Sequence, residues 1–263
     1  MRRIDALRSA ARAVAALALR AALLACACSC ADPTRVPPPV PPGAIPAGAV
    51  LGTGAIKGRV AYTGAPREPQ PISFSSDAAC HKQRQGEPLR EDLVVGASGA
   101  LRYAFVHVAG GLEGRVFAPP EGPSTLDQRG CVYLPHVLGI QVGQPLLILN
   151  SDPTLHNVHV TAEQNKAFNF GMSVQGQKAT RYFSAPEVMI RAKCDVHPWM
   201  ISFIGVVAHP FYDVTGEDGR FSIEGLPAGT YVVEAWQESL GARRETVSLS
   251  EGDQREVDFT FPG

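Results

Sequence analysis

Residues 194–200, with the sequence CDVHPWM, contain three side chains that can bind a metal. They are the thiol of Cys194, the imidazole of His197 and the thioether of Met200. A loop this short, placed after an apolar stretch, can direct all three at one ion. A thiolate, an imidazole and a weak thioether suit copper in both of its oxidation states. One further imidazole would complete a site for a single copper ion.

Segment 150–159, with the sequence NSDPTLHNVH, supplies that imidazole as His156. It follows the apolar stretch 145–149. Two His and one Cys with a long axial Met form the blue-copper geometry that carries electrons. Zinc is the alternative metal, although a Met ligand is unusual for it. Without a metal, Cys194 would be an ordinary buried thiol.

These segments resemble the blue-copper (cupredoxin) proteins of the amicyanin and plastocyanin type, over roughly residues 130–208. The resemblance implies a Greek-key β-sandwich with one type 1 copper ion, held by His156, Cys194, His197 and Met200. His159 matches a family position that is not a ligand. The sequence has Leu155 where the family has Pro, Trp199 where it has Phe, and a longer spacing before the first ligand. None of these differences removes a ligand.

The resemblance also implies roles for the neighbours of the ligands. Asn157 is expected to tie the ligand loops together, with a turn-stabilising Asn as the alternative. His136 precedes a strand, 137–142, that we expect to pair antiparallel with 145–149. It should therefore lie near the copper end, beside the ligands or on the rim, unless it is simply a half-exposed residue at a strand end.

Pro198 and Trp199 flank His197. In the resembling proteins the edge of this ligand is exposed within an apolar patch. We expect a redox partner to dock there transiently, because small weak interfaces suit rapid exchange. Core packing is the alternative role for Trp199.

The N-terminal segment reads as a targeting sequence. Four Arg residues within the first 12 precede an Ala- and Leu-rich stretch that ends at residue 25, which is typical of a secretory signal in 1–25. The tetrapeptide LLAC at 23–26 resembles a bacterial lipobox, so Cys26 is expected to carry lipid; Cys28 and Cys30 are weaker candidates. A soluble export signal is the alternative.

The Pro-rich segment 26–52 would then be the lipidated N-terminus and an extended tether. These features predict an exported protein of the bacterial cell envelope, anchored by lipid and facing the periplasm or the exterior. Cys80 and Cys131 are the remaining Cys residues. Export makes a disulfide between them plausible, and two free buried thiols are the alternative.

Short apolar stretches separated by Gly and Pro turns predict an all-β protein. Segments 53–110 and 208–263 resemble the carboxypeptidase regulatory-like (transthyretin-like) β-sandwich, through GAIKGRV at 54–60 and TGEDGRFSIEGLPAGTYVV at 215–233. We therefore expect that sandwich to be discontinuous, with residues 111–207 as the copper domain. The polar stretch 66–91 is expected to be irregular.

Composition narrows the functions further. The net charge of −1 provides no basic face for nucleic acid. No His-x-His or His-Cys-His cluster is present for additional coppers, so a multicopper enzyme is not expected. The sequence predicts a non-enzymatic electron carrier, with copper binding, storage or delivery as the alternative.

Overall fold

The computed structural model describes residues 32–65, 68, 70–74, 77–83 and 88–263. The predicted signal, Cys26, Cys28 and Cys30 lie outside the described residues. Residues Pro33–Gly263 form a compact unit, and this unit is all-β as predicted. Its helical segments are one α-helix, α2 (Ala78–Gln83), and two 3-10 helices, η1 (Pro33–Arg35) and η2 (Ala97–Gly99). No helix in the described part of the chain is long and apolar enough to cross a membrane.

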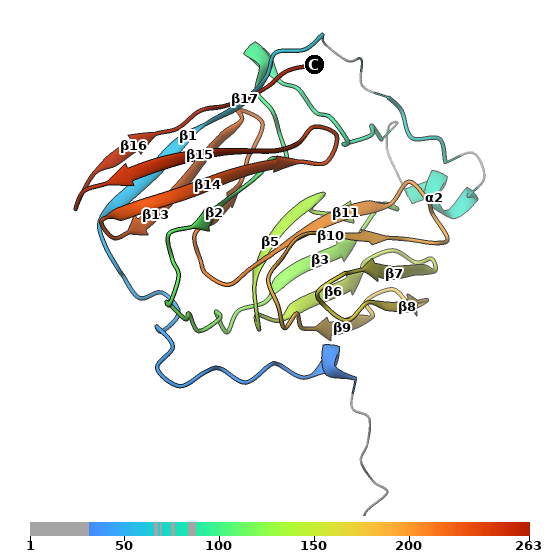
Figure 1. Cartoon of the computed structure of the whole chain (residues 1–263). Helices are drawn as coiled ribbons and strands as arrows, with labels where there is room; N and C mark the ends of the chain where they lie inside the picture. Colours follow the sequence, from blue (N-terminus) through green and yellow to red (C-terminus); the bar gives the residue numbers. More distant parts are fainter. Residues whose placement is uncertain (1–31, 66–67, 69, 75–76, 84–87) are drawn as a thin grey trace, which may run out of the picture. The chain divides into compact units, whose positions relative to one another are not determined.

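Strands from the two ends of this unit form one sandwich, here called the N/C sandwich (Figure 1). One sheet has the order β13-β1-β16, with β17 also paired to β1; its strands are β1 (Gly54–Tyr62), β13 (Arg220–Leu226), β16 (Gln254–Glu256) and β17 (Phe259–Phe261). The other has the order β12-β2-β14-β15, from β2 (Phe105–Gly110), β12 (Tyr212–Val214), β14 (Gly229–Gln237) and β15 (Gly241–Leu249). Alternate residues of β13, such as Phe221 and Ile223, face the core between the sheets.

Strands β3 to β11 form a second sandwich, here called the central sandwich. One sheet has the order β5-β11-β10-β7-β8, from β5 (Val137–Gln141), β7 (His156–Thr161), β8 (Phe168–Met172), β10 (Glu187–Lys193) and β11 (Ile201–Val207). The other has the order β4-β3-β6-β9, from β3 (Ser124–Gln128), β4 (Tyr133–Leu134), β6 (Leu146–Asn150) and β9 (Lys178–Arg181). A separate hydrophobic core lies between these two sheets.

The predicted antiparallel pairing of 137–142 with 145–149 is wrong. Strand β5 pairs in parallel with β11, and β6 pairs in parallel with β3, so the two strands belong to different sheets. The turn at Gly143 therefore carries the chain from one sheet to the other. Two apolar stretches around a Gly turn have the same pattern in a hairpin and in such an arch, because both stretches bury side chains.

The two sandwiches meet through a small apolar cluster built on Phe105, Val137 and Val207. Gly139 of β5 lies opposite Gly205 of β11. A Cβ added at Gly205 would approach the ring of Phe105 to 2.5–2.8 Å, and one at Gly139 would approach the ring of Tyr212 to 2.1 Å. Glycine is therefore required at both positions for the rings of the N/C sandwich to lie against the sheet.

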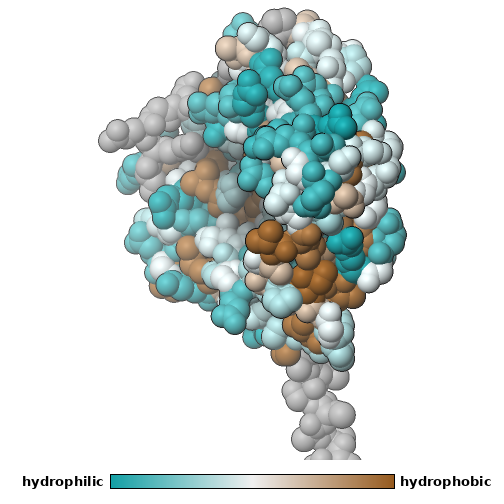
Figure 2. Space-filling model, turned by 90° about the vertical axis from the view of Figure 1, so that its left-hand side faces the viewer, coloured by the Kyte–Doolittle hydropathy of each residue, from teal (hydrophilic) through white to brown (hydrophobic). Residues whose placement is uncertain are grey.

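The Pro-rich segment, expected to be an extended tether, makes defined contacts with the sandwiches in its described part. The carbonyl of Thr34, which is buried, accepts a hydrogen bond from the amide of Tyr182 at 2.8 Å. Ile45 forms a β-bridge with Phe117 and packs against the core of the N/C sandwich. On the face in Figure 2, mainly hydrophilic residues are interrupted by a hydrophobic patch. An extended Pro-rich chain leaves its carbonyls free to make such bonds, so residues from 33 onward lie along the sandwiches.

Replacing Gly205 with Ala should lower the free energy of unfolding by about 1–3 kcal/mol, because the added methyl group overlaps the buried ring of Phe105. The matched control is Gly122→Ala, since a Cβ at Gly122 has no atom within 4 Å. Urea unfolding of both variants measures the difference. Equal stability of the two would show that Phe105 is not packed as described.

Candidate metal centre

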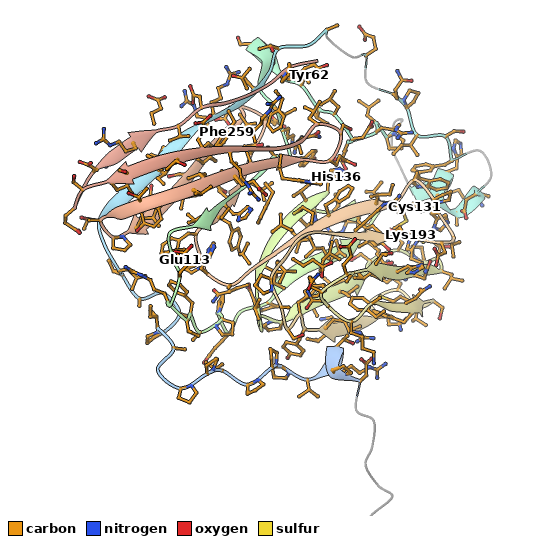
Figure 3. All side chains as sticks on the ribbon, in the orientation of Figure 1. Tyr62, Glu113, Cys131, His136, Lys193 and Phe259 are labelled. Atoms are coloured by element: carbon orange, nitrogen blue, oxygen red, sulfur yellow. A yellow bond between two sulfur atoms is a disulfide. The ribbon has the colours of Figure 1, made fainter. Side chains whose placement is uncertain are left out.

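The four predicted ligands come from two neighbouring strands and one loop. His156 begins β7, and Cys194 directly follows β10; the two strands pair antiparallel, with Lys193 opposite His159. Figure 3 shows Lys193 and Cys131 at the same end of the central sandwich. His197 and Met200 lie in the loop between β10 and β11. All four predicted ligands are at most 1% exposed, so the site is built into the end of the core.

Backbone hydrogen bonds close the loop 194–200 tightly. The amide of Cys194 donates to the carbonyl of Met200 at 3.1 Å, and the amide of Met200 donates to the carbonyl of His197 at 2.9 Å. The amide of His197 lies 3.4 Å from the sulfur of Cys194 and donates to it. These bonds hold the loop in a form that turns the His197 and Cys194 side chains toward each other.

The donor atoms of three ligands converge on one point. Nδ1 of His156 lies 2.9 Å from Nδ1 of His197, and Sγ of Cys194 lies 3.8 Å from the latter. Donor atoms of all three residues lie within 4.8 Å of one another. Both imidazoles therefore present the same nitrogen, Nδ1, to the thiol, which is an arrangement that one ion can satisfy.

The environment also prepares Cys194 to bind a metal. Burial raises the pKa of its thiol, but hydrogen bonds from His156 and His197 and from two backbone amides outweigh this effect and lower the pKa to about 6. A thiol with such a pKa is mostly thiolate at neutral pH, and the thiolate is the form that binds metals.

Each imidazole is held at its outer nitrogen by a carboxylate. Nε2 of His156 lies 2.9 Å from Oδ2 of Asp152, and Nε2 of His197 lies 3.0 Å from Oδ2 of Asp77. Burial lowers the pKa of His156, but Asp152 and Cys194 outweigh it and raise the pKa to about 9. A carboxylate on Nε2 fixes the ring and leaves Nδ1 for a metal, as in carboxylate–histidine–metal triads.

The two carboxylates are themselves fixed by backbone amides. Asp152 is 2% exposed and accepts from the amides of Gly130 and Cys131 at 2.7 and 2.8 Å. Asp77 accepts from the amides of Ala79 and Cys80 at the start of α2. The rings are therefore oriented by carboxylates that backbone amides hold in place.

Sequence reasoning missed both carboxylates. The sequence offered a clue to Asp152, because this residue precedes His156 by four positions in the same turn. It offered no clue to Asp77, because this residue lies 120 positions from His197 in a polar stretch that was expected to be irregular.

Asn157 joins the two ligand segments, which is the position expected for it. Its side-chain oxygen accepts from the amide of Asp195 at 2.7 Å and lies 3.3 Å from the sulfur of Cys194. Its amide nitrogen donates to Asn169 and to Asp195. Asn157, which follows His156, thereby fixes Asp195, which follows Cys194.

Cys80 and Cys131 form a disulfide with a Cα–Cα distance of 5.6 Å. It joins α2 to the segment before β4, and so fastens part of the 66–91 stretch to the central sandwich. Sγ of Cys80 lies 3.5 Å from Nε2 of His197. The disulfide therefore stands directly beside the metal centre, on the carboxylate side of the rings.

His136 lies at the end of the central sandwich that carries loop 194–200, as expected, because β5 starts beside the start of β11 and the carbonyl of His136 accepts from the amide of Phe203. Among the described residues, the polar contacts of its side chain are with Glu91 and Glu238, and its ring packs edge to face with those of Tyr103 and Phe203; none is with a predicted ligand. The strand end was therefore placed correctly, although the pairing partner assumed for β5 was wrong. His136 connects the two sandwiches and does not contact the predicted ligands.

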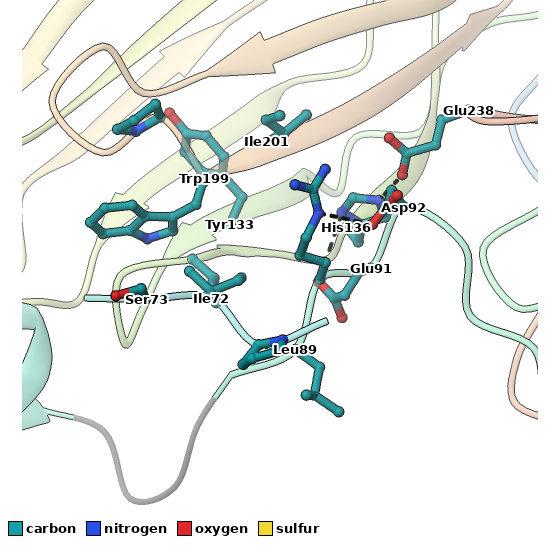
Figure 4. Close-up of a pocket in the computed structure, with 14 residues that line it drawn as sticks. Ile72, Ser73, Leu89, Glu91, Asp92, Tyr133, His136, Trp199, Ile201 and Glu238 are labelled. Carbon is teal, nitrogen blue, oxygen red and sulfur yellow. Dashed lines mark hydrogen bonds and ion pairs between the residues drawn. The ribbon is translucent and has the colours of Figure 1, made fainter. Parts of the chain in front are cut away.

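A cavity of about 260 Å³ separates His136 from Trp199. Figure 4 shows Trp199 and Tyr133 on one side of it and His136 with Glu91 and Glu238 on the other. Pro198, which is exposed, also lines it. The ring of Trp199 lies 5.2 Å from that of His197, and its indole nitrogen donates to the carbonyl of Cys131. The exposed ligand edge expected at His197 is absent, since His197 is 1% exposed and Asp77 covers its outer nitrogen.

No protein-family model matches the chain, and no curated protein is significantly similar to it. Among solved structures, parts of the chain are similar to a Cu-containing nitrite reductase from Thermus scotoductus SA-01, at 23% identity over 38% of this chain and 25% of that one, with a TM-score of 0.31. A purple cupredoxin from Nitrosopumilus maritimus is 21% identical over 32% of this chain and 99% of its own, with a TM-score of 0.28. A mutant of amicyanin in its Cu(I) form is 20% identical over 39% of this chain and 98% of its own, with a TM-score of 0.30. Each similarity is low and covers well under half of the chain.

Replacing Asp77 with Asn should weaken copper binding roughly 10- to 100-fold, the usual effect of removing an outer partner of a metal ligand. Asn still caps α2, so the fold should be preserved. The matched control is Asp258→Asn, because Asp258 also accepts from a backbone amide, that of Arg59, but belongs to the N/C sandwich. Competition with a copper chelator gives both affinities. An unchanged affinity for Asp77→Asn would contradict the role of this carboxylate.

Proposed function

We propose that the chain binds one copper ion through His156, Cys194, His197 and Met200 in a type 1 site and carries single electrons. The observation that supports this most is that two imidazole Nδ1 atoms and one cysteine sulfur, all of buried residues, lie close together. That ligand set suits copper, and Met200, buried in the same core, supplies the weak fourth ligand. A thioether argues against zinc.

The protein's own residues keep this site rigid. Asp77 and Asp152 orient the two rings, Asn157 fixes the loop after Cys194, and loop 194–200 is closed by its own backbone. Bound copper would take up and release one electron at this site. Ligands that hold their positions in both oxidation states keep the reorganisation small, which makes exchange fast.

Burial of the ligands favours an electron carrier over an enzyme. His156, Cys194, His197 and Met200 are at most 1% exposed, so a substrate has no direct access to the ion. An electron needs no such access. Trp199 contacts the ring of His197 and lines the surface cavity together with exposed Pro198, so we propose that a transient redox partner approaches there.

Copper storage or delivery is the second candidate. It is favoured by the disulfide, which lies 3.5 Å from a nitrogen of His197 and could couple thiol chemistry to the site. In either role we propose an exported, lipid-anchored protein of the bacterial envelope, on the basis of the Arg-rich start and the LLAC tetrapeptide at 23–26.

The purified chain, loaded with copper and oxidised, should be intensely blue, because a cysteine thiolate bound to Cu(II) gives a strong charge-transfer band in type 1 sites. An absorption spectrum with a copper analysis tests the proposal. Cys194→Ser should lose the band, since the sulfur is gone. A colourless wild type containing one copper would rule out the type 1 site.

Replacing Met200 with Gln should leave copper bound and lower the reduction potential. The amide oxygen is a harder ligand than the thioether and favours Cu(II), while the two imidazoles and the thiolate still hold the ion. The control is Met189→Gln, because Met189 packs where the sandwiches meet. Voltammetry measures both variants. A Met200→Gln potential equal to that of wild type, or an irreversible wild-type couple, would shift support to copper delivery.

Replacing Cys26 with Ala should release the protein from the membrane fraction, because the residue that would carry lipid is lost. Cys28→Ala is the matched control and should remain in the membrane fraction. Fractionation of cells followed by immunoblotting gives the answer. Unchanged membrane association of Cys26→Ala at normal expression would contradict lipidation at this residue.

A further inference from the structure

The two ligand imidazoles have a second set of donors at their outer edge. Asp77 and Cys80 lie with His197 in one group whose donor atoms are within 4.8 Å of one another, and Cys131 and Asp152 lie with His156 in another. Cys80 and Cys131 are bonded to each other, so the two groups are contiguous. The rings thus stand between two clusters: Cys194 at the Nδ1 edge, and the disulfide with two carboxylates at the Nε2 edge.

We propose that reduction of the Cys80–Cys131 disulfide creates a second copper site, in which the two thiolates bind Cu(I) beside the first. Soft thiolates are among the ligands that favour Cu(I). This site goes beyond the proposed electron transfer, and its ligands are separate from Cys194 and Met200.

The two sulfurs should stay together after reduction, because other bonds hold each cysteine in place. Cys80 follows Asp77, whose carboxylate binds both the start of α2 and His197. The amide of Cys131 donates to Asp152 at 2.8 Å, and its carbonyl accepts from the indole of Trp199 at 2.9 Å. None of these bonds depends on the disulfide. Both sulfurs are buried, so a metal between them would be shielded from water.

The reduction balances with a dithiol as the partner. The dithiol gives up two electrons and two protons and closes its own disulfide, while the sulfurs of Cys80 and Cys131 each gain one electron and one proton. Binding of Cu(I) then displaces the two thiol protons to solvent. The product is a pair of thiolates that share the metal next to the Nε2 edges of His156 and His197.

A Cu(I) titration of oxidised and reduced protein tests this. The full chain carries Ser at positions 26, 28 and 30, so that Cys80, Cys131 and Cys194 are its remaining cysteines. One sample is reduced with a phosphine and desalted without oxygen, and both samples compete for Cu(I) with bathocuproine disulfonate. Reduced protein should bind one more Cu(I) than oxidised protein. An equal number in the two samples would overturn the proposal.

Two variants separate this site from the first. Cys194→Ser should retain the additional Cu(I) on reduction, even if the type 1 site proves wrong. The double variant Cys80→Ser, Cys131→Ser should show no difference between the two conditions, and its blue band with oxidised copper reports that it is folded. A difference that persists in the double variant overturns the proposal. So does loss of the near-ultraviolet circular dichroism of the reduced protein, because the thiolates would then have left the site.

Discussion

The hydrogen bond between the imidazole of each predicted ligand and a carboxylate held by backbone amides is the constraint on which the candidate centre depends. An imidazole has two nitrogens, and a ring free to turn would offer either of them to a metal. Asp152 and Asp77 bind Nε2 of His156 and His197, so both rings present Nδ1 toward Cys194. The elements that carry these carboxylates, the turn after β6 and the start of α2, must therefore be placed as accurately as the ligand strands.

The same carboxylates balance the charge of the buried centre. Burial lowers the pKa of both rings, but contacts of His156 with Asp152 and Cys194, and of His197 with Cys194 and Asp77, outweigh it and raise the pKa of each ring. Nδ1 of His156 lies 2.9 Å from Nδ1 of His197, so one of these two nitrogens donates and the other accepts. A cation between the rings would be compensated by the Cys194 thiolate and by the two carboxylates behind the rings.

Local sequence predicted the parts of the candidate site that depend on short spacing. The predicted ligands Cys194, His197 and Met200 share one loop, and alternation of apolar residues indicated most of the strands that flank it. Contacts between distant segments could not be predicted in this way. The pairing of β5 with β11 in place of β6, the docking of Asp77 on His197 and the contact of His136 with Glu238 all join residues far apart in sequence. Periodicity reports which face of a strand is buried but not which strand lies beside it.

The fusion of the two sandwiches explains why the cavity beside the centre exists. Gly139 and Gly205 remove side chains from the sheet of the central sandwich, so Phe105 and Tyr212 of the N/C sandwich can pack against it. That contact brings Glu238, which follows β14, over His136. Residues of both sandwiches therefore line the cavity between His136 and Trp199. The ring of Trp199, on one side of the cavity, lies 5.2 Å from the ring of His197. An isolated central sandwich would lack Glu91, Asp92 and Glu238, so Trp199 would face solvent instead of an enclosed cavity.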